Sequence, residues 1–154
     1  MKKNIIVTIS LLLLSSCLLF ACVKETEYDN KEIATILYYS VDGWGVDCGY
    51  KIYDFDKMTY SEKTWGTEEY EVKANLTKEK VETFLKNIKT HGIFLLEKHY
   101  KTDKVIDDGG TSYLVITFKD ETTFNSSFYF KYPSQIKKLD KDFLALSGYK
   151  LFEI

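Results

Sequence analysis

Arginine is absent from this chain of 154 residues, so lysine supplies nearly all of its cationic side chains. Bidentate guanidinium contacts to phosphate or to guanine are therefore not available to it. The chain is also mildly acidic, with a formal net charge of −2. These two features exclude the basic surface that nucleic-acid-binding proteins use, and we expect no nucleic-acid partner.

The chain is also poor in proline, cysteine and histidine. Its single proline, Pro133, leaves no proline-rich linker. The two histidines, His91 and His99, lie eight residues apart, which is not the spacing of a known metal-binding motif. We therefore expect no metal site and no cofactor. By contrast, 45% of the residues are apolar and 16% are aromatic, which indicates a globular fold rich in β-sheet.

The strongest pattern lies at the N-terminus. Lys2 and Lys3 precede an uncharged apolar run over residues 4–23, as in a secretory signal peptide. The run ends in Leu19-Phe20-Ala21-Cys22, which resembles the lipobox of bacterial lipoproteins. The resemblance covers residues 1–22. It implies cleavage before Cys22, attachment of diacylglycerol to its sulfur and, in Gram-negative cells, acylation of the new amino group. Loss of Lys2 and Lys3 changes the formal net charge from −2 to −4.

Two alternatives compete with this interpretation. Leu14-Ser15-Ser16-Cys17 also fits the lipobox pattern, but cleavage there would leave an apolar stretch, residues 18–21, exposed behind the anchor. Residues 4–23 are also long enough for an uncleaved transmembrane helix of about 20 residues. The serines and threonines of this run, together with the cysteine motif, favour cleavage and a lipid anchor on Cys22.

The remaining sequence divides into two parts. Residues 22–32 are polar and charged, which predicts an acylated cysteine followed by a tether that could reach about 33 Å. Residues 33–154 suit one domain. We therefore divide the chain into a signal peptide (1–21), an acylated cysteine with its tether (22–32) and a single domain (33–154).

Strand patterns dominate the domain. Alternation of apolar and polar residues predicts one buried and one wet face, with Tyr70, Val72, Phe128 and Phe130 among the residues facing the core. Residues 101–111 are predicted as a loop, and the apolar run at 93–96 has no clear period. The predicted strands cover residues 33–41, 48–55, 59–65, 69–74, 112–119 and 122–132, with a short tail at 149–154 as a further candidate.

Two amphipathic helices complete the domain. One follows Thr77, whose hydroxyl could cap it, and stops at Gly92. The other follows Ser134 as its cap and ends at Gly148. The expected fold is α+β: a mostly antiparallel sheet of five to six strands with both helices on one face. This layout is similar to that of small, uncharacterised envelope lipoproteins, a resemblance that implies no functional residue.

Aromatic residues crowd the first half of the domain, where they could either fill the core or form a binding surface for proteins or glycans. Trp44 and Trp65 lie beside glycines in predicted turns, which are usually exposed. We select these two tryptophans as the candidate binding surface. If the sheet buries the other aromatic side chains, they serve packing alone.

Catalytic patterns are weak. Cys48 is the one cysteine of the domain, and it could be a nucleophile with His91 or His99 as base, or simply a small buried side chain. Asp103, together with the acidic pair at 107–108, precedes two glycines in a loop that could bind a weak cation or be a solvated turn. No complete catalytic set is present, and we expect no enzyme.

The sequence therefore predicts a lipid-anchored protein of the bacterial cell envelope. Resemblance to the sorting rule of bacterial lipoproteins implies the outer membrane if the host is Gram-negative, because Val23 rather than aspartate follows Cys22. The expected role is a non-enzymatic binding or adaptor module with a protein or glycan partner. The alternatives are a thiol-dependent enzyme using Cys48 and a carbohydrate-binding module using Trp44 and Trp65.

Overall fold

A computed structural model describes residues 26–103 and 109–152, apart from the side chains of Asp47 and Cys48. The α+β prediction is confirmed, although the sheet has seven strands rather than five to six. The strands are β1 (Ile33–Val41), β2 (Asp47–Asp54), β3 (Thr59–Thr64), β4 (Glu71–Asn75), β5 (His99–Lys101), β6 (Thr111–Phe118) and β7 (Thr123–Tyr129). The helices are α2 (Lys78–Thr90), α3 (Ser134–Ser147) and the short 3₁₀ helix η1 (Ile93–Leu95).

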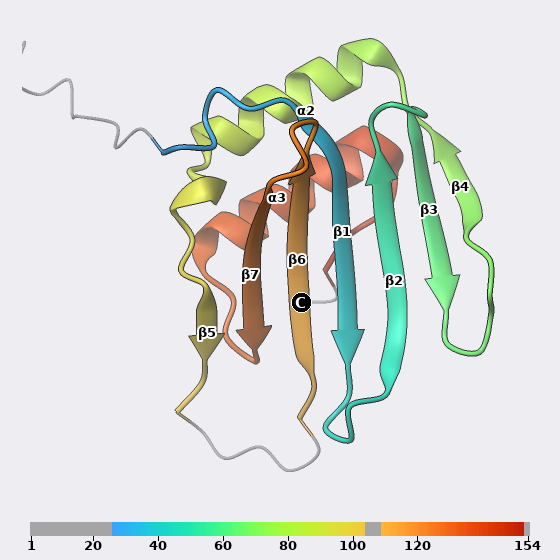
Figure 1. Cartoon of the computed structure of the whole chain (residues 1–154), viewed down its shortest axis with the longest axis vertical. Coiled ribbons are helices and arrows are strands. Elements are labelled where there is room, and N and C mark those ends of the chain that lie inside the picture. Colours follow the sequence, from blue (N-terminus) through green and yellow to red (C-terminus); the bar gives the residue numbers. More distant parts are fainter. Residues whose placement is uncertain (1–25, 104–108, 153–154) are drawn as a thin grey trace, which may run out of the picture.

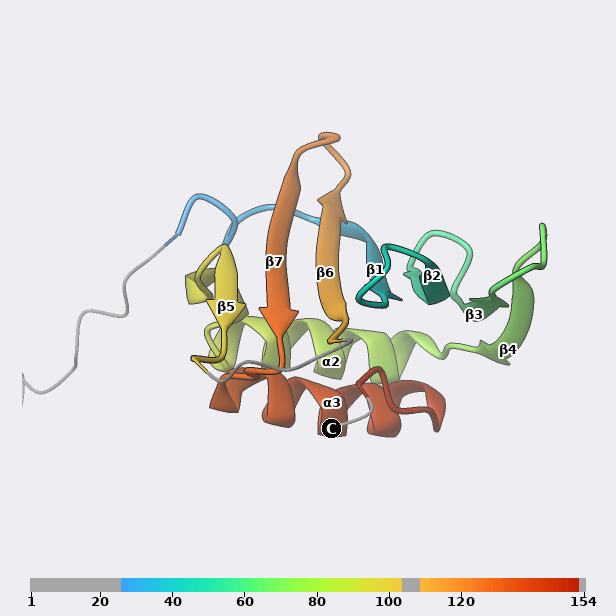
Figure 2. The ribbon, with the colours of Figure 1, turned by 90° about the horizontal axis from the view of Figure 1, so that it is seen from below.

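The strand order is β4-β3-β2-β1-β6-β7-β5, so the first strand lies in the middle of the sheet. Neighbouring strands are antiparallel except for β5, which runs parallel to β7. Figure 1 views the sheet from its open face, and Figure 2 shows both helices on the opposite face. We call these the open face and the helix face. The C-terminal ends of β1, β3, β5 and β7 lie at the bottom of Figure 1. We call this end of the sheet the lower edge, as distinct from the lateral edge strands β4 and β5.

The core lies between the helix face and the two helices. Burial alternates along β6, where Leu114, Ile116 and Phe118 are buried while the residues between them are partly exposed. This period of two is what a half-buried strand requires. Rings from both layers meet in the core: Phe143 of α3 lies 4.5 Å from Tyr53 and 4.7 Å from Phe84, measured between ring centroids.

The helices begin and end close to their predicted positions. Gly92 and Gly148 both adopt the left-handed conformation after a helix, with φ of 66° and 84°, as predicted for stop residues. The predicted caps are wrong in detail. Thr77 precedes α2 but makes no side-chain capping bond, and Pro133 rather than Ser134 occupies the N-cap of α3. Proline suits the start of a helix because the backbone N–H that it lacks would have no hydrogen-bond partner within the helix there.

The last described residues form a buried tail rather than a strand. Leu151 and Phe152 are fully buried, and both of their backbone N–H groups donate to Oδ1 of Asp140 at 2.9 Å. Asp140 itself is buried on α3. In an edge strand these two N–H groups would donate to backbone carbonyls of the neighbouring strand. Here the carboxylate of Asp140 accepts both of them instead. The tail at 149–154 is therefore not a strand over its described residues.

Two other expectations fail at the borders of the sheet. Tyr70 and Val72, predicted to face the core, are 44% and 56% exposed. A register shift between Tyr60 and Ser61 and the position of β4 at the edge account for this, because little of the helix layer covers the edge strand. The run at 93–101 forms η1 and β5, both of which are too short to leave a periodic pattern.

Candidate functional site

Large exposed aromatic side chains gather at the lower edge of the sheet. Trp44 is 81% exposed and Trp65 is 71% exposed, and they lie in the β1–β2 and β3–β4 turns. Phe130, which follows β7, is 51% exposed, and Tyr70 precedes β4. We call these four residues the aromatic edge. All four belong to connections at the lower end of the sheet (Figure 1). Large exposed apolar side chains that gather in one region of a surface indicate a candidate interaction site.

The turn that carries Trp44 is organised by one carboxylate. Oδ1 of Asp42 accepts the backbone N–H groups of Trp44 and Val46, each at 2.9 Å. The N–H of Asp42 donates to the carbonyl of Val46, and Gly45 adopts a φ of +79° that suits glycine. These hydrogen bonds fix the backbone of the turn that carries the exposed indole of Trp44.

Trp65 is displayed in a similar way by a second turn. The backbone N–H and the hydroxyl of Thr67 both donate to the carbonyl of Thr64, at 3.2 and 2.8 Å. Gly66 has a φ of +81°, as position i+2 of a type II turn requires. The two tryptophans thus lie on separate hairpins of the same sheet.

Phe130 was not predicted as a surface residue. The alternating pattern of residues 122–132 placed it on the buried face, but β7 ends at Tyr129 and Phe130 has a φ of +52°. This left-handed backbone, uncommon outside glycine, turns the chain away from the sheet, and the Phe130 ring crosses that of Tyr129 edge-on at 5.4 Å. Nothing in an alternating sequence marks the point where alternation stops.

The connections at the lower edge are acidic. Within their described residues (42–46, 65–70, 102–103, 109–110 and 130–133) they carry four carboxylates and one lysine. The carboxylates are those of Asp42, Glu68, Glu69 and Asp103, and the lysine is Lys131. This edge therefore combines large apolar side chains with negative charge.

A row of tyrosines on the open face continues the aromatic surface inward. Tyr39 stacks between Tyr50 and Tyr113, with ring centroids 5.6 and 4.7 Å apart. The three belong to β2, β1 and β6, and each is partly exposed. Lys63 lies over the rings of Tyr50 and Tyr70, at 5.8 and 6.0 Å, and so joins this row to the aromatic edge.

The predicted aromatic cluster therefore divides by position. Tyr38, Tyr53 and Tyr60 are buried in the core, so packing explains them. Burial, together with a hydrogen bond to Glu62, raises the pKa of Tyr60 far above its ordinary value, so this hydroxyl stays neutral.

On the helix face near the lower edge, a hollow of about 270 Å³ is lined by residues that include Lys51 and Glu62. Its described lining residues include no nucleophile paired with a base.

The thiol hypothesis finds no support in the topology. Cys48 lies on β2, but its side chain is outside what the structure describes. His99 lies on β5, four strands away, which is about 19 Å at ordinary strand spacing. Nδ1 of His99 bonds to the hydroxyl of Ser127 at 2.8 Å. His91 is the C-cap residue of α2. Its Nε2 lies 2.9 Å from Oδ2 of Asp142 on α3, so His91 links the two helices.

In the predicted cation loop, Asp103 is exposed, whereas residues 107 and 108 lie outside the described residues. The predicted lipidation site, Cys22, also lies outside the described residues. Over residues 26–103 and 109–152, no group of three or more His, Cys, Asp or Glu side chains could hold a metal ion.

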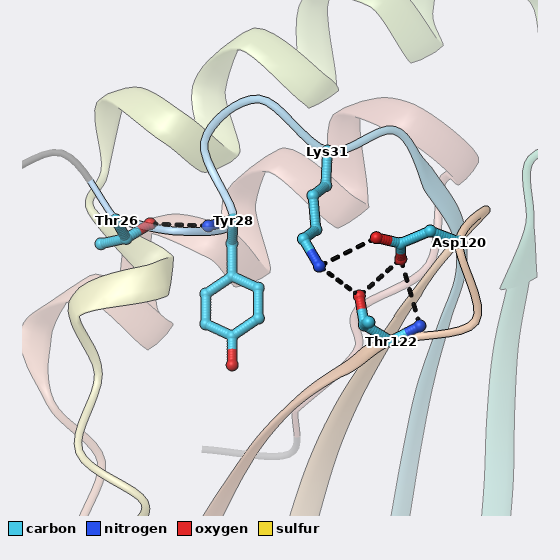
Figure 3. Close-up of polar contacts among 5 residues, drawn as sticks. All are labelled: Thr26, Tyr28, Lys31, Asp120 and Thr122. Atoms are coloured by element: carbon cyan, nitrogen blue, oxygen red, sulfur yellow. Dashed lines mark hydrogen bonds and ion pairs between the residues drawn. The ribbon is translucent and has the colours of Figure 1, made fainter.

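A second cluster of contacts fixes residues 26–32, which we call the leading segment. The sequence predicts a tether here, but these residues lie against the domain. The ring of Tyr28 is 5.4 Å from Phe118 and 5.5 Å from Phe124. Nζ of Lys31 lies 2.9 Å from Asp120 and donates to the hydroxyl of Thr122 at 2.7 Å (Figure 3). The leading segment is thus held at the β6–β7 turn, at the end of the sheet opposite the aromatic edge (Figure 1).

The carboxyl of Asp120 should report on this contact. Its pKa is lowered from 3.8 to about 2, first by the hydrogen bond from the Thr122 hydroxyl and then by that from Lys31. Because the folded pKa lies below the unfolded one, the contact stabilises the fold above about pH 4 and loses this effect as the pH falls towards 2. We expect Thr122→Val to raise the pKa of Asp120 towards its ordinary value, measured by NMR titration of the carboxyl carbon.

The control for this titration is Thr123→Val, which makes the same change one residue further along. The Thr123 hydroxyl accepts a hydrogen bond from Asn125 at 3.1 Å instead. Thr123→Val should leave the midpoint of Asp120 near 2. Equal midpoints in the two variants would show that the Thr122 hydroxyl does not hold the carboxylate.

Comparison with known proteins does not place the chain in a family. No protein-family model matches the sequence, and no curated protein matches it either. Within the described residues, no helix is both long enough and apolar enough to cross a bilayer.

Proposed function

We propose that this protein is a lipid-anchored binding module of the bacterial cell envelope, and that its aromatic edge binds a partner protein. The observation that carries the proposal is the arrangement of Trp44, Trp65 and Phe130 on one edge of a rigid sheet. The lipobox-like motif ending at Cys22 supports the anchor. The topology separates Cys48 from His99 and so gives an enzyme no comparable support.

The chemistry of the edge favours a particular kind of partner surface. Exposed tryptophan, tyrosine and phenylalanine supply most of the binding energy in protein interfaces when they enter apolar pockets. The connections that carry these rings hold four carboxylates and one lysine in their described residues, and Lys63 lies over the ring of Tyr70. The remaining negative charge favours a rim of lysine or arginine on the partner. We therefore propose a partner protein with an apolar pocket bordered by basic side chains.

Photo-cross-linking in intact cells tests this proposal. A photoreactive phenylalanine analogue at position 44 or 65 of the full acylated chain should form an adduct with one envelope protein. The cross-linked peptide should contain or adjoin lysine or arginine. Charge reversal by Glu68→Lys with Glu69→Lys should lower the adduct yield about tenfold, because like charges would then face each other across the rim.

Leu144 gives the matched control position. It is 44% exposed on α3, on the opposite face from the tyrosine row, so the analogue placed there should give no such adduct. Equal adducts from positions 44 and 144 would contradict the proposal. Adducts with polysaccharide alone would replace the protein partner with a glycan.

A further inference from the structure

We infer that the lipid anchor holds this domain in one orientation, with the corner formed by the end of α2, η1 and the leading segment resting on the bilayer surface. This inference rests on the proposed acylation of Cys22. It names the partner of that corner as the surface of a lipid bilayer, and it directs the aromatic edge away from the membrane.

The first argument is the length of chain between the lipid and the domain. A free tether over residues 22–32 would reach about 33 Å and would allow any orientation. The leading segment, however, is fixed from Thr26 onward by the stacked ring of Tyr28 and the bonds of Lys31. Only residues 23–25 then separate Cys22 from Thr26, a span of about 14 Å at full extension. Whatever lies beside Thr26 must therefore lie near the lipid head groups.

The second argument is which part of the molecule lies beside the leading segment. The ring of Tyr28 is 5.7 Å from that of Phe94 in η1, and the ammonium of Lys89, in the last turn of α2, donates to the carbonyl of Asp29. Leu95, the next residue of η1, is 47% exposed. Figures 1 and 2 both place η1 and the end of α2 next to the leading segment. We call these elements the anchor corner.

The third argument is the distribution of charge. The anchor corner (residues 26–32 and 86–98) carries four lysines and four carboxylates, whereas the described connections of the lower edge carry four carboxylates and one lysine. Lys86, Lys89 and Lys98 of the corner are exposed. An anionic membrane surface repels the acidic lower edge but not the balanced corner, so charge and chain length favour the same orientation.

Quenching of tryptophan fluorescence by brominated lipids tests the orientation, because brominated acyl chains quench only at contact distance. The chain has two tryptophans, and both lie on the aromatic edge. The acylated protein, extracted from membranes and reconstituted into vesicles of phosphatidylcholine and phosphatidylglycerol, should keep nearly all of its emission. A nine-residue strand of about 30 Å separates this edge from the end that carries the leading segment.

A reporter at the anchor corner should behave in the opposite way. Leu95→Trp, in a background with Trp44→Phe and Trp65→Phe, should lose about half of its emission, because an interfacial side chain sits at the level of the upper acyl chains. Leu144→Trp in the same background is the control, since Leu144 is 44% exposed and Leu95 is 47% exposed. This control should lose almost nothing. Tyr28→Ala with Lys31→Ala should free the leading segment and reduce quenching of the Leu95 reporter.

The outcomes separate the orientation from the anchor itself. Intact mass and co-flotation with vesicles report acylation. If the acylated protein floats but Trp44 and Trp65 are quenched, or the Leu95 reporter is not, the orientation is wrong and the anchor stands. If the chain carries no acyl mass or does not float, the anchor fails and the orientation fails with it.

Discussion

Phe143→Ala should destabilise the domain by about 4 kcal/mol and lower its thermal midpoint by about 15 °C. Phe143 is fully buried on α3, between Tyr53 of the sheet and Phe84 of α2. Truncation would remove the ring that joins all three elements and leave a cavity that rigid neighbours cannot fill. Urea unfolding followed by circular dichroism measures the change.

The control lies one residue along the same helix. Leu144 is 44% exposed, so Leu144→Ala should cost less than about 1 kcal/mol. A similar loss in both variants would mean that α3 depends on helix propensity rather than on the packing of Phe143.

Asp140→Ala should cost about 3 kcal/mol, because it removes a buried carboxylate and leaves two buried backbone N–H groups without an acceptor. These are the N–H groups of Leu151 and Phe152, each 2.9 Å from Oδ1 of Asp140. Loss of this bond should also release the ring of Phe152, which packs 4.9 Å from that of Tyr38. Hydrogen exchange at residues 151 and 152 should therefore accelerate more than exchange in β1.

Two variants accompany this measurement. Asp140→Asn keeps a side-chain oxygen and should lose about half as much stability, because a neutral acceptor forms weaker hydrogen bonds than a carboxylate. Lys141→Ala changes an exposed neighbour and should alter the stability by less than about 0.5 kcal/mol. Equal effects of Asp140→Ala and Lys141→Ala would show that the carboxylate does not hold the tail.

The periodic parts of the fold were predictable from the sequence. The hairpins, both helices and their glycine stops follow from side-chain periods and from φ values that favour glycine. The parallel pairing of β5 with β7 was not predictable, because three residues carry no period and the pairing joins residues 28 apart. The buried tail was also not predictable from the sequence. Its backbone N–H groups donate to Asp140, and nothing in the sequence distinguishes Asp140 from an exposed polar residue of the helix.

The candidate site was predictable only where turn chemistry marks it. Trp44 and Trp65 stand next to glycines, and both tryptophans are exposed as a turn position implies. Whether they bind a partner stays a prediction. Phe130 carries no such signal, because its exposure depends on one backbone angle. The leading segment was predicted as a free tether because its composition is polar apart from Tyr28. The ring of Tyr28 packs against Phe118 and Phe124, and this contact holds the segment on the domain.

The position of the first strand has a consequence for how the chain matures. β1 pairs with β2 and, on its other side, with β6, which lies about 80 residues further along, and the core is closed by residues 151 and 152. Contacts between such distant parts of a chain form slowly, and here they need residues 151 and 152 to be present. The core of this domain therefore cannot close around β1 until a segment more than a hundred residues further along the chain has joined it.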